Sequence, residues 1–598
     1  MKRQCLAAML TAGFALPALA ASTSVATVAD LISAVQNANN NDEIVVMASG
    51  SPYEFTADQK DVVAHLYARV TITLRGETGN PADVVLVGNA NRILYLAAGG
   101  NTISGLTFRT GDCTGYEKRS VAEGVPYDQL RGGAIASAQN GDSNTQISNC
   151  IFDSCRSVNG GGACGAYALL NSCFGKYDSC VFVNNCSTDG LGGAVFAAYS
   201  IDGCTFLTNT TSGAKYGSGG AVYGFGSISR SLFEKNRLTD AGASTKGGGA
   251  VYMPTNTRFE GPVIEACDFV ANSVSAHYGG AVRSAHSGLS VIGSTFKNNS
   301  CNSGCGGALC DVNSIISCTI VSNATSSSAG FGGGAYNCTL TRCFMASNYA
   351  YRCGAAADSS LYSCTNCAND GGGYTELGKS STASSCYAED CVFLDAGRAA
   401  ITMFGSCGFN RCRFENMRGG RMFTQYIALT NCLVANGKSV NTYFYNLESD
   451  SSLINCTVVS NSWSDKFMSG SKQVLAVENS FFYGNDIPST APSVVVAFNN
   501  CILSAASNDY IPGSGNYNYY SERATFNAGF VGVEKDPANP FAITRRSPAF
   551  AKAGIVEGWM STATDIRGEG FPRLRDGAVN IGCYQCWDLI PGLCVIIR

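Results

Sequence analysis

The sequence is poor in charge and in histidine, and it has no long uninterrupted apolar run. Lys, Arg, Asp and Glu make up 14% of the 598 residues, the net charge is −4, and three histidines are present. So small a charge excess gives no support for nucleic acid or an anionic membrane as a partner. Since no segment after the first twenty residues offers 18 consecutive apolar residues, we expect no transmembrane segment in the mature chain.

The first twenty residues have the parts of a secretion signal. Lys2 and Arg3 form a basic start, residues 6–16 form an apolar core, and Ala18-Leu19-Ala20 is a cleavage site. The apolar core is too short to span a bilayer. We therefore expect residues 1–20 to be removed and the mature chain to be secreted or displayed at a cell surface, extracellular or associated with an outer membrane.

Glycine is abundant, with 69 residues, and two short motifs alternate along the chain. The Gly-Gly-Ala motif begins at positions 132, 161, 192, 219, 248, 279, 306 and 333. The second motif is Cys/Ser-x-Phe-x-x-Asn, as in Cys204, Phe206 and Asn209. Its Cys or Ser recurs at positions 150, 180, 204, 231, 267, 294, 318, 343, 364, 391, 412, 432, 456, 480 and 501, with shortest steps of 20–24 residues. A repeat of this length predicts a solenoid.

The spacing within the motifs predicts the structure of one coil. Cys and Phe two residues apart share one face of a strand, which we place inward. The Asn three residues after Phe suits a left-handed corner, and the glycines suit a second, tight corner. Coils this short leave no room for helices. We predict an all-β, right-handed parallel β-helix of about sixteen coils, roughly 75 Å long at about 4.8 Å per coil.

The repeat also suggests the limits of the regions. Residues 21–69 form an N-terminal cap and first strand, with a helix over 28–35 and a strand over 43–47. Residues 70–515 form the β-helix, which begins with strands at 70–74, 84–87 and 103–108. Residues 516–598, where the repeat fades, form a C-terminal closing segment. An amphipathic helix at the start covers the otherwise bare edge of the first coil.

Both ends of the chain resemble those of secreted right-handed parallel β-helix proteins of the pectin-lyase-like superfamily. The stretch Asp30–Phe55 looks like their usual start, and Asp565–Gln585 is similar to the Asp-x-x-Gly-x-Pro-Arg…Asp-Ile-Gly-Ala-Tyr-Glu tail of many bacterial members. The tail departs from that pattern by an extra residue before the proline and by Asn580, Cys583 and Gln585. The resemblance implies the fold more specifically than any function.

The two repeated motifs also look like those of chlamydial polymorphic outer-membrane proteins, which are surface adhesins. This second resemblance implies adhesion at a cell surface. We expect no counterpart of that family's C-terminal autotransporter segment, so its membrane anchoring is not carried over.

Many proteins of the first resemblance cut acidic polysaccharides, so the alternative function is a polysaccharide lyase or glycoside hydrolase. The polygalacturonase motifs are absent as a set, and His277 and His286 lie in sequences typical of turns. A calcium site needs six to eight oxygen ligands, several of them carboxylate, and no local cluster has that spacing. Carboxylates from different coils remain candidates. The pairs are Asp358 with Asp390 and Asp370 with Glu376, with Arg342 or Arg352 as base; their other interpretation is solvated surface positions.

The largest and most charged insertion, residues 112–131, is the candidate binding site. Its candidate ligand-binding residues are Asp112, Tyr116, Lys118, Arg119, Tyr127 and Arg131. The alternative is a surface loop with no ligand. Three further insertions, 211–218, 238–246 and 325–331, fall between an Asn and the next Gly-Gly-Ala, so we expect them to leave the rod at one corner.

The sequence contains 29 cysteines, and twelve of the fifteen aligned slots of the second motif are Cys. Side chains stacked about 4.8 Å apart in parallel coils are too far apart for disulfides, so we predict buried, free thiols in these slots. Disulfides are expected instead at Cys164/Cys173, Cys301/Cys305 and Cys583/Cys586.

Together these patterns favour a binding, adhesive or structural protein, with a glycan or a cell surface as ligand. The residues indicate no cofactor and no metal site, since Cys583-x-x-Cys586 lacks a second pair at zinc spacing. The sequence does not indicate the oligomeric state.

Overall fold

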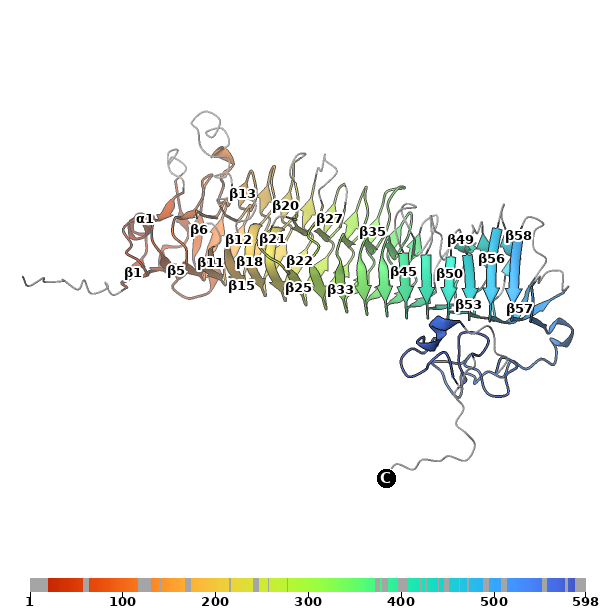
Figure 1. The fold of residues 1–598 in the computed structure, drawn as a ribbon. Helices are drawn as coiled ribbons and strands as arrows, with labels where there is room; N and C mark the ends of the chain where they lie inside the picture. The colour runs from red at the N-terminus through yellow and green to blue at the C-terminus, as the bar shows by residue number, and fades with distance from the viewer. Residues whose placement is uncertain are drawn as a thin grey trace, which may run out of the picture.

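The computed structural model shows a long rod of stacked coils, with the C-terminal segment against one flank of its last coils (Figure 1). It describes residues 20–56, 64–116, 131–138, 142–166, 174–213, 217–239, 247–255, 257–276, 278–371, 377–378, 386–395, 407–418, 421–424, 427–438, 440–445, 451–461, 463–469, 473–487, 494–506, 513–550, 557–575 and 579–586. The predicted signal peptide lies outside these residues except for Ala20. The fold is the predicted right-handed parallel β-helix.

Sheet A is the longest sheet and has two columns of parallel strands, which merge at β18 and β21. The long column contains β1 (Ser22–Val25), β2 (Asp42–Val46), β5 (Ile72–Gly76), β8 (Thr102–Ser104), β11 (Asp142–Ser148), β15 (Phe174–Asp178), β18 (Val195–Asp202), β21 (Val222–Ser229), β25 (Val263–Glu265), β29 (Ser290–Ile292), β33 (Ser314–Ile316), β37 (Thr339–Thr341), β41 (Ser360–Tyr362), β45 (Cys386–Glu389), β47 (Cys407–Asn410), β50 (Ile427–Thr430), β53 (Ser451–Ile454), β56 (Gln473–Glu478) and β58 (Val494–Asn499). The short column contains β4 (Leu66–Ala68), β7 (Leu94–Leu96), β10 (Ile135–Ser137), β14 (Cys164–Ala166), β24 (Val251–Met253), β28 (Val282–Ser284), β32 (Leu309–Cys310), β36 (Ala335–Tyr336), β40 (Ala356–Ala357) and β44 (Leu377–Gly378).

The other sides of the coil are formed by shorter sheets. Sheet B contains β3 (Tyr53–Glu54), β6 (Val85–Val87), β9 (Thr107–Arg109), β12 (Ile151–Asp153), β16 (Val181–Val183), β19 (Thr205–Leu207), β22 (Leu232–Glu234), β26 (Asp268–Val270), β30 (Thr295–Lys297), β34 (Thr319–Val321), β38 (Phe344–Ala346), β42 (Thr365–Cys367), β46 (Val392–Leu394), β48 (Arg413–Glu415), β51 (Leu433–Ala435), β54 (Thr457–Val459), β57 (Phe481–Ile487), β59 (Ile502–Ala505) and β60 (Tyr517–Asn518). Sheet C contains β13 (Arg156–Ser157), β17 (Cys186–Ser187), β20 (Thr210–Thr211), β23 (Arg237–Leu238), β27 (Ser273–Val274), β31 (Ser300–Cys301), β35 (Ala324–Thr325), β39 (Tyr349–Ala350) and β43 (Asp370–Gly371). A small sheet near the end contains β49 (Arg421–Thr424), β52 (Val440–Tyr445) and β55 (Trp463–Ser469).

The predicted cap helix is present as α1 (Val28–Gln36). Thr27 caps it by accepting a hydrogen bond from the Asp30 backbone N–H, and Leu31 and Val35 are buried in the core of the first coils. The predicted strand over 103–108 is instead two strands, β8 and β9. Gly105 takes a positive φ of 64° between them, so the chain turns a corner there.

Phenylalanine side chains stack along the interior of the middle coils. The rings of Phe182, Phe206, Phe233, Phe269 and Phe296 follow one another at centroid distances of 4.6–4.8 Å and lie within 6° of parallel. All five are fully buried. The predicted inward face of the Cys-x-Phe motif is confirmed.

The Asn of the second motif has a different role from the predicted one. The residue before it takes the left-handed backbone, as Lys235 does at φ 54° and Ala271 at φ 54°. The Asn side chain points inward and joins a ladder: Asn272 Nδ2 donates to Asn299 Oδ1 at 3.0 Å and to the Phe233 carbonyl at 2.8 Å. Stacking thus satisfies amides that would otherwise be buried without partners.

The Gly-Gly-Ala motif shifts by one residue at its last predicted position. Ala335 pairs with Leu309, and Gly332, with φ 66°, occupies the left-handed corner rather than Gly333. In the next coil Cys353 takes that corner with φ 62°, so the motif continues without its first glycine.

The twelve cysteines in the aligned slots are buried, free thiols, as predicted. A slot thiol can act as both acceptor and donor: Cys204 Sγ accepts from the Cys180 N–H at 3.4 Å and donates to the Asp202 carbonyl at 3.3 Å. Ser231 makes the same two contacts, through the Cys204 N–H and the Ser229 carbonyl, so serine substitutes for cysteine there. Burial raises the pKa of a slot thiol such as Cys501 to about 12, which keeps it protonated.

The disulfides predicted outside the slots are not formed where the structure describes both partners. No disulfide joins Cys301 to Cys305; Cys301 is fully buried on β31, whereas Cys305 lies at the corner before Gly306 and is partly exposed. No disulfide joins Cys583 to Cys586 either, and both are buried in the cluster under the C-terminal segment. Cys173 lies outside the described residues.

The C-terminal segment covers the outer face of sheet B rather than continuing the coils. Its core, the flank cluster, joins outward residues of the last coils to residues of the segment, which includes the short turns η6 (Tyr520–Glu522) and η7 (Gly558–Ser561). The cluster contains Leu433, Ala435, Val459, Phe481, Ile502, Tyr519, Ala528, Ala542, Ile543, Ala549, Ile566, Ile581, Cys583, Tyr584 and Cys586. Figure 1 shows the segment lying beside β53 to β58.

Candidate functional site

The outer face of sheet A carries a column of hydroxyl side chains in register. Strand pairing places Ser200 beside Ser227, Ser290 beside Ser314, and Thr339 beside Ser360, with Val263 between the first two pairs. We name the hydroxyl column by its six members, Ser200, Ser227, Ser290, Ser314, Thr339 and Ser360. Adjacent strands place neighbouring hydroxyls about 4.8 Å apart along the rod axis.

These six hydroxyls are accessible and have no protein partner among the described residues. Each side chain is half-buried between its neighbours, and no hydrogen bond to another described residue engages its oxygen. Other outward hydroxyls differ: Ser229 Oγ, two residues after Ser227, donates to Asp202 at 2.7 Å. A flat row of hydroxyls can donate to and accept from a ligand at each coil.

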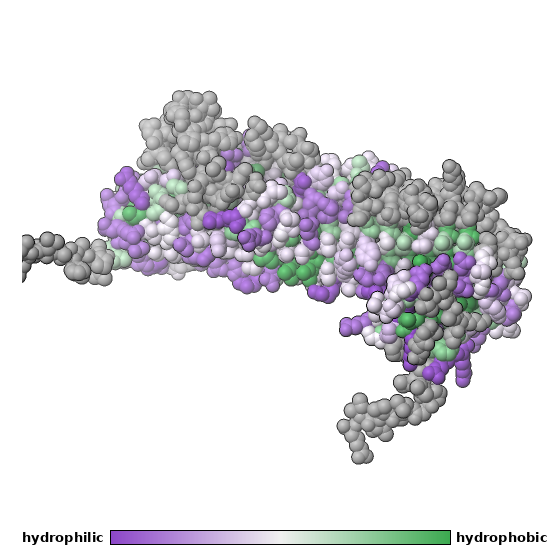
Figure 2. Space-filling view, in the orientation of Figure 1, coloured by the Kyte–Doolittle hydropathy of each residue, from purple (hydrophilic) through white to green (hydrophobic). Residues whose placement is uncertain are grey.

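In Figure 2 this view of the rod is mostly pale to purple, with green areas near its middle and beside the C-terminal segment. The strands β45, β50, β53, β56 and β58 of sheet A face the viewer in the same orientation in Figure 1. The six members of the hydroxyl column are polar and uncharged, which suits hydrogen bonding to an uncharged, extended ligand.

The residues predicted in the 112–131 insertion are described only in part. Asp112 lies at the start of the insertion, where its carboxylate accepts from the Thr114 N–H at 2.7 Å. Arg131 lies at its end, 6% exposed, with its guanidinium 4.0 Å from the centre of the Phe196 ring. Tyr116 ends the turn η3 (Thr114–Tyr116).

Lys118, Arg119 and Tyr127 lie outside the described residues. The structure thus gives local structural contacts to the two ends of the insertion, and a ligand site there stays a prediction. The three smaller insertions do share a corner: each begins at the last residue of a strand of sheet C, namely Thr211, Leu238 and Thr325.

Of the two carboxylate pairs predicted for the enzyme alternative, the described one, Asp358 with Asp390, is not brought together. Asp358 follows β40 and Asp390 follows β45, so the two carboxylates lie at opposite ends of the long-column strands. Asp390 instead forms an ion pair with Arg411, at 2.6 Å. Arg342 occupies the same corner as Asp390 but two coils earlier, and Arg352 packs 5.2 Å from the Phe331 ring.

The side chain of Asp370 and all of Glu376 lie outside the described residues. Of the histidines, His286 lies in a turn, as its sequence indicated, where Nδ1 accepts from the Gly288 N–H at 3.0 Å. His65 is buried, and burial lowers its pKa despite a 2.6 Å contact with the Gly88 carbonyl. His277 lies outside the described residues.

Within the described ranges, no group of three or more His, Cys, Asp or Glu side chains is placed to hold a metal ion. The same ranges contain no helix that is long and apolar enough to cross a membrane.

Three solved structures are similar to this chain at low sequence identity and low TM-score. The PL6 family alginate lyase AlyGC is 11% identical, with 83% of this chain and 100% of that chain covered and a TM-score of 0.20. An arginine-to-alanine mutant of AlyGC is 10% identical, with 83% and 96% covered and a TM-score of 0.22. PfbA, a surface adhesin of Streptococcus pneumoniae, is 12% identical, with 73% and 92% covered and a TM-score of 0.26. No family model and no curated protein matches the sequence.

Sequence reasoning missed the hydroxyl column, although the signal was present in the repeat. Each of its members stands four residues before a Cys or Ser slot, as Ser227 does before Ser231 and Ser314 before Cys318. The aligned slots identify the inward residues. The outward hydroxyls can be recognised as one surface only when the register of neighbouring strands is known.

Proposed function

We propose that the chain is a secreted or cell-surface binding protein whose β-helix holds an extended glycan along its outer face. The observation that supports this most is the hydroxyl column: six hydroxyls in register, half-buried and without partners among the described residues. A row that repeats at the coil spacing, interrupted at Val263, suits a polymer that also repeats, because each of the six coils can contact a similar part of the ligand. An adhesive role follows if that glycan belongs to a cell surface.

A second feature supports binding over catalysis. In the described part of the chain, the carboxylates that the enzyme alternative requires lie at different corners or in ion pairs. Lyases and hydrolases need an acid and a base within hydrogen-bond reach of one bond of the substrate. The polar row offers many weak contacts and no such pair.

The test is retention of the purified mature chain on immobilised neutral and acidic polysaccharides, with the soluble fraction monitored for cleavage. We expect retention on at least one polymer without release of sugar. The double variant Ser290→Ala/Ser314→Ala should weaken that retention about fivefold to tenfold, since each lost hydrogen bond contributes about 0.5–1.5 kcal/mol. Release of unsaturated, ultraviolet-absorbing products would instead establish a lyase.

The matched control is Ser273→Ala/Ser300→Ala. These two serines are also half-buried and outward, and they lie in register on neighbouring coils, but on sheet C. We expect this variant to bind like the unmodified chain. Equal loss in both double variants would show that the outer face of sheet A is not the binding surface.

A further inference from the structure

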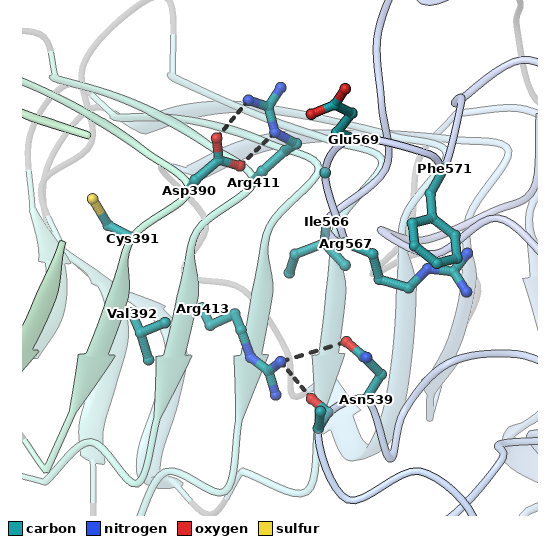
Figure 3. A pocket seen from close by; sticks show the side chains of 12 residues that line it. Asp390, Cys391, Val392, Arg411, Arg413, Asn539, Ile566, Arg567, Glu569 and Phe571 are labelled. Carbon is teal, nitrogen blue, oxygen red and sulfur yellow. Dashed lines mark hydrogen bonds and ion pairs between the residues drawn. The ribbon is translucent and has the colours of Figure 1, made fainter. Parts of the chain in front are cut away.

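A pocket of about 510 Å³ opens where the C-terminal segment meets the corner between sheets A and B (Figure 3). One wall comes from two neighbouring coils and the other from residues about 150 positions later in the chain. It is lined by Asp390, Cys391, Val392, Arg411, Arg413, Ala538, Asn539, Ile566, Arg567, Gly568, Glu569 and Phe571. Its volume lies within the range of roughly 300–1,000 Å³ typical of small-molecule sites.

The three arginines of the pocket are charge-compensated. Arg411 makes two hydrogen bonds to Asp390, at 2.6 and 2.8 Å, and one to Glu389 at 2.8 Å. Figure 3 shows the Asp390 carboxylate facing the Arg411 guanidinium, with the two hydrogen bonds between them. Such a bidentate ion pair fixes the Arg411 guanidinium in one orientation.

Arg413 and Arg567 are also paired with carboxylates. Arg413 pairs with Glu415 at 2.7 Å and donates to the Ala538 carbonyl, which ties sheet B to the C-terminal segment. Arg567 pairs with the buried Asp565 and lies 4.0 Å from the centre of the Phe571 ring. Each positive charge in the pocket therefore already has a negative partner.

Donors and acceptors nevertheless remain available. Among the described residues, no hydrogen bond engages Nη1 of Arg411, Nη2 of Arg413 or Nη1 of Arg567. Glu569 stands exposed at the rim, and within the same residues its carboxylate has no ion pair or hydrogen bond. Figure 3 shows this carboxylate on the Arg411 side of the pocket.

The presence of both guanidinium and carboxylate groups in the pocket indicates the class of ligand. An anion would meet the carboxylates of Asp390 and Glu569, and a cation would meet three guanidinium groups. A neutral polyol avoids both, because each of its hydroxyls can accept from a guanidinium N–H and donate to a carboxylate. The apolar side chains of Val392, Ile566 and Phe571 offer a surface for the C–H face of a sugar ring.

We propose that this pocket binds one neutral sugar residue, as a second glycan site separate from the hydroxyl column. The proposal rests on the proposed function for the class of ligand only. The two sites differ in shape: the column takes repeated contacts along a polymer, and the pocket takes a single ring or a chain end.

The test is titration of the full mature chain with methyl glycosides of glucose, galactose, mannose and N-acetylglucosamine, followed by calorimetry and saturation-transfer NMR. Galacturonate and glucosamine serve as the anionic and cationic probes. We expect a neutral glycoside to bind more tightly than either charged sugar. Preference for galacturonate or glucosamine overturns the proposal, and so does the absence of binding by every neutral probe.

Glu569→Ala should weaken binding of the neutral probe at least tenfold, since a hydrogen bond to a charged group is lost. Glu534→Ala is the matched control, because Glu534 is also an exposed glutamate of the C-terminal segment and does not line the pocket. Equal affinity of the two variants overturns the proposal.

Failure of the pocket proposal can be distinguished from failure of the proposed function by testing each variant for both kinds of binding. The Ser290→Ala/Ser314→Ala chain should keep full affinity for the glycoside, and the Glu569→Ala chain should keep its retention on polymer through the hydroxyl column. Loss of glycoside binding in the serine variant would show that the pocket is not an independent site.

Discussion

The coils around Phe269 and the coils around Phe481 share one backbone geometry but place their apolar residues differently. In the middle coils, outward positions of sheet B such as Asp268 and Lys297 are exposed to solvent. In the last coils the same positions hold Leu433 and Phe481, which are fully buried under the C-terminal segment. Stacking alone therefore dictates the inward residues, and the outward residues depend on what covers them.

The two regions also differ in what stabilises the outside of the coil. The middle coils carry the Asn ladder, in which each side chain satisfies backbone groups of its neighbours. The last coils continue this pattern at Asn461 and Asn485 and add the flank cluster as a second hydrophobic core outside the rod. Hydrogen bonds repeated from coil to coil are thus common to both regions, and the large apolar contact is specific to the last coils.

The sharpest test of this contrast uses two phenylalanines in one outward column of sheet B. Phe481 is fully buried under the C-terminal segment, whereas Phe344 is 42% exposed. Phe481→Ala should lower the free energy of unfolding by about 3–5 kcal/mol, as for a buried aromatic residue. Phe344→Ala should lower it by less than about 1 kcal/mol. Urea denaturation followed by circular dichroism measures both; similar losses would mean that the segment does not protect the flank.

Breaking the Asn ladder should affect the middle coils by a similar but smaller amount. In Asn272→Ala the N–H of Asn236 and the carbonyl of Phe233 lose their side-chain partner. Because these groups are buried, we expect a loss of about 2–4 kcal/mol in the same denaturation experiment. The exposed Asn302 provides the control: Asn302→Ala should change stability by less than about 0.5 kcal/mol.

The cysteine slots are common to both regions, so alkaline pH should weaken both. Burial raises the pKa of Cys267 to about 12, against about 8.5 for a thiol in the unfolded chain. Its contribution is therefore complete below about pH 8.5 and is lost as the pH rises toward 12.

Cys267→Ser removes this titration and keeps the geometry that Ser231 and Ser294 already use. Between pH 8.5 and 10 its free energy of unfolding should fall by about 2 kcal/mol less than that of the unmodified chain. Parallel falls in the two proteins would show that this thiol titrates alike when folded and unfolded.

The smallest expected effect is a stabilisation where the interior ladder is interrupted. Asn366 occupies the position of the stacked phenylalanines, between Met345 and Phe393, and is fully buried. Among the described residues neither its Oδ1 nor its Nδ2 has a hydrogen-bond partner. Asn366→Leu should raise the free energy of unfolding by about 1–2 kcal/mol, since an unsatisfied amide is costly to bury.

Asn348→Leu is the control for that substitution. Asn348 belongs to the ladder, and its Nδ2 donates to Asn369 at 2.9 Å. The same change should therefore destabilise the protein at Asn348. A destabilising effect at both positions would show that Asn366 has a partner in solution.

Much of the fold could be predicted because the repeat is local. A register shift of one residue would turn Cys204 and Phe206 outward, so their spacing leaves one arrangement. The cap helix was predictable from the spacing of Leu31 and Val35. The inward hydrogen-bonded ladder of Asn side chains was not predictable from the sequence. Asn suits both a left-handed corner and such a ladder, and the two roles differ only in which neighbouring group forms the hydrogen bond.

The sequence by itself determined the period of the coil, its inward residues and the free state of the slot thiols, since each follows from contacts with the next coil. Only the tertiary structure decided which outward residues form surfaces. The hydroxyl column needs the register of strands up to 160 positions apart, from Ser200 to Ser360. The pocket needs the docking of a segment without a repeat, which no periodic pattern could position.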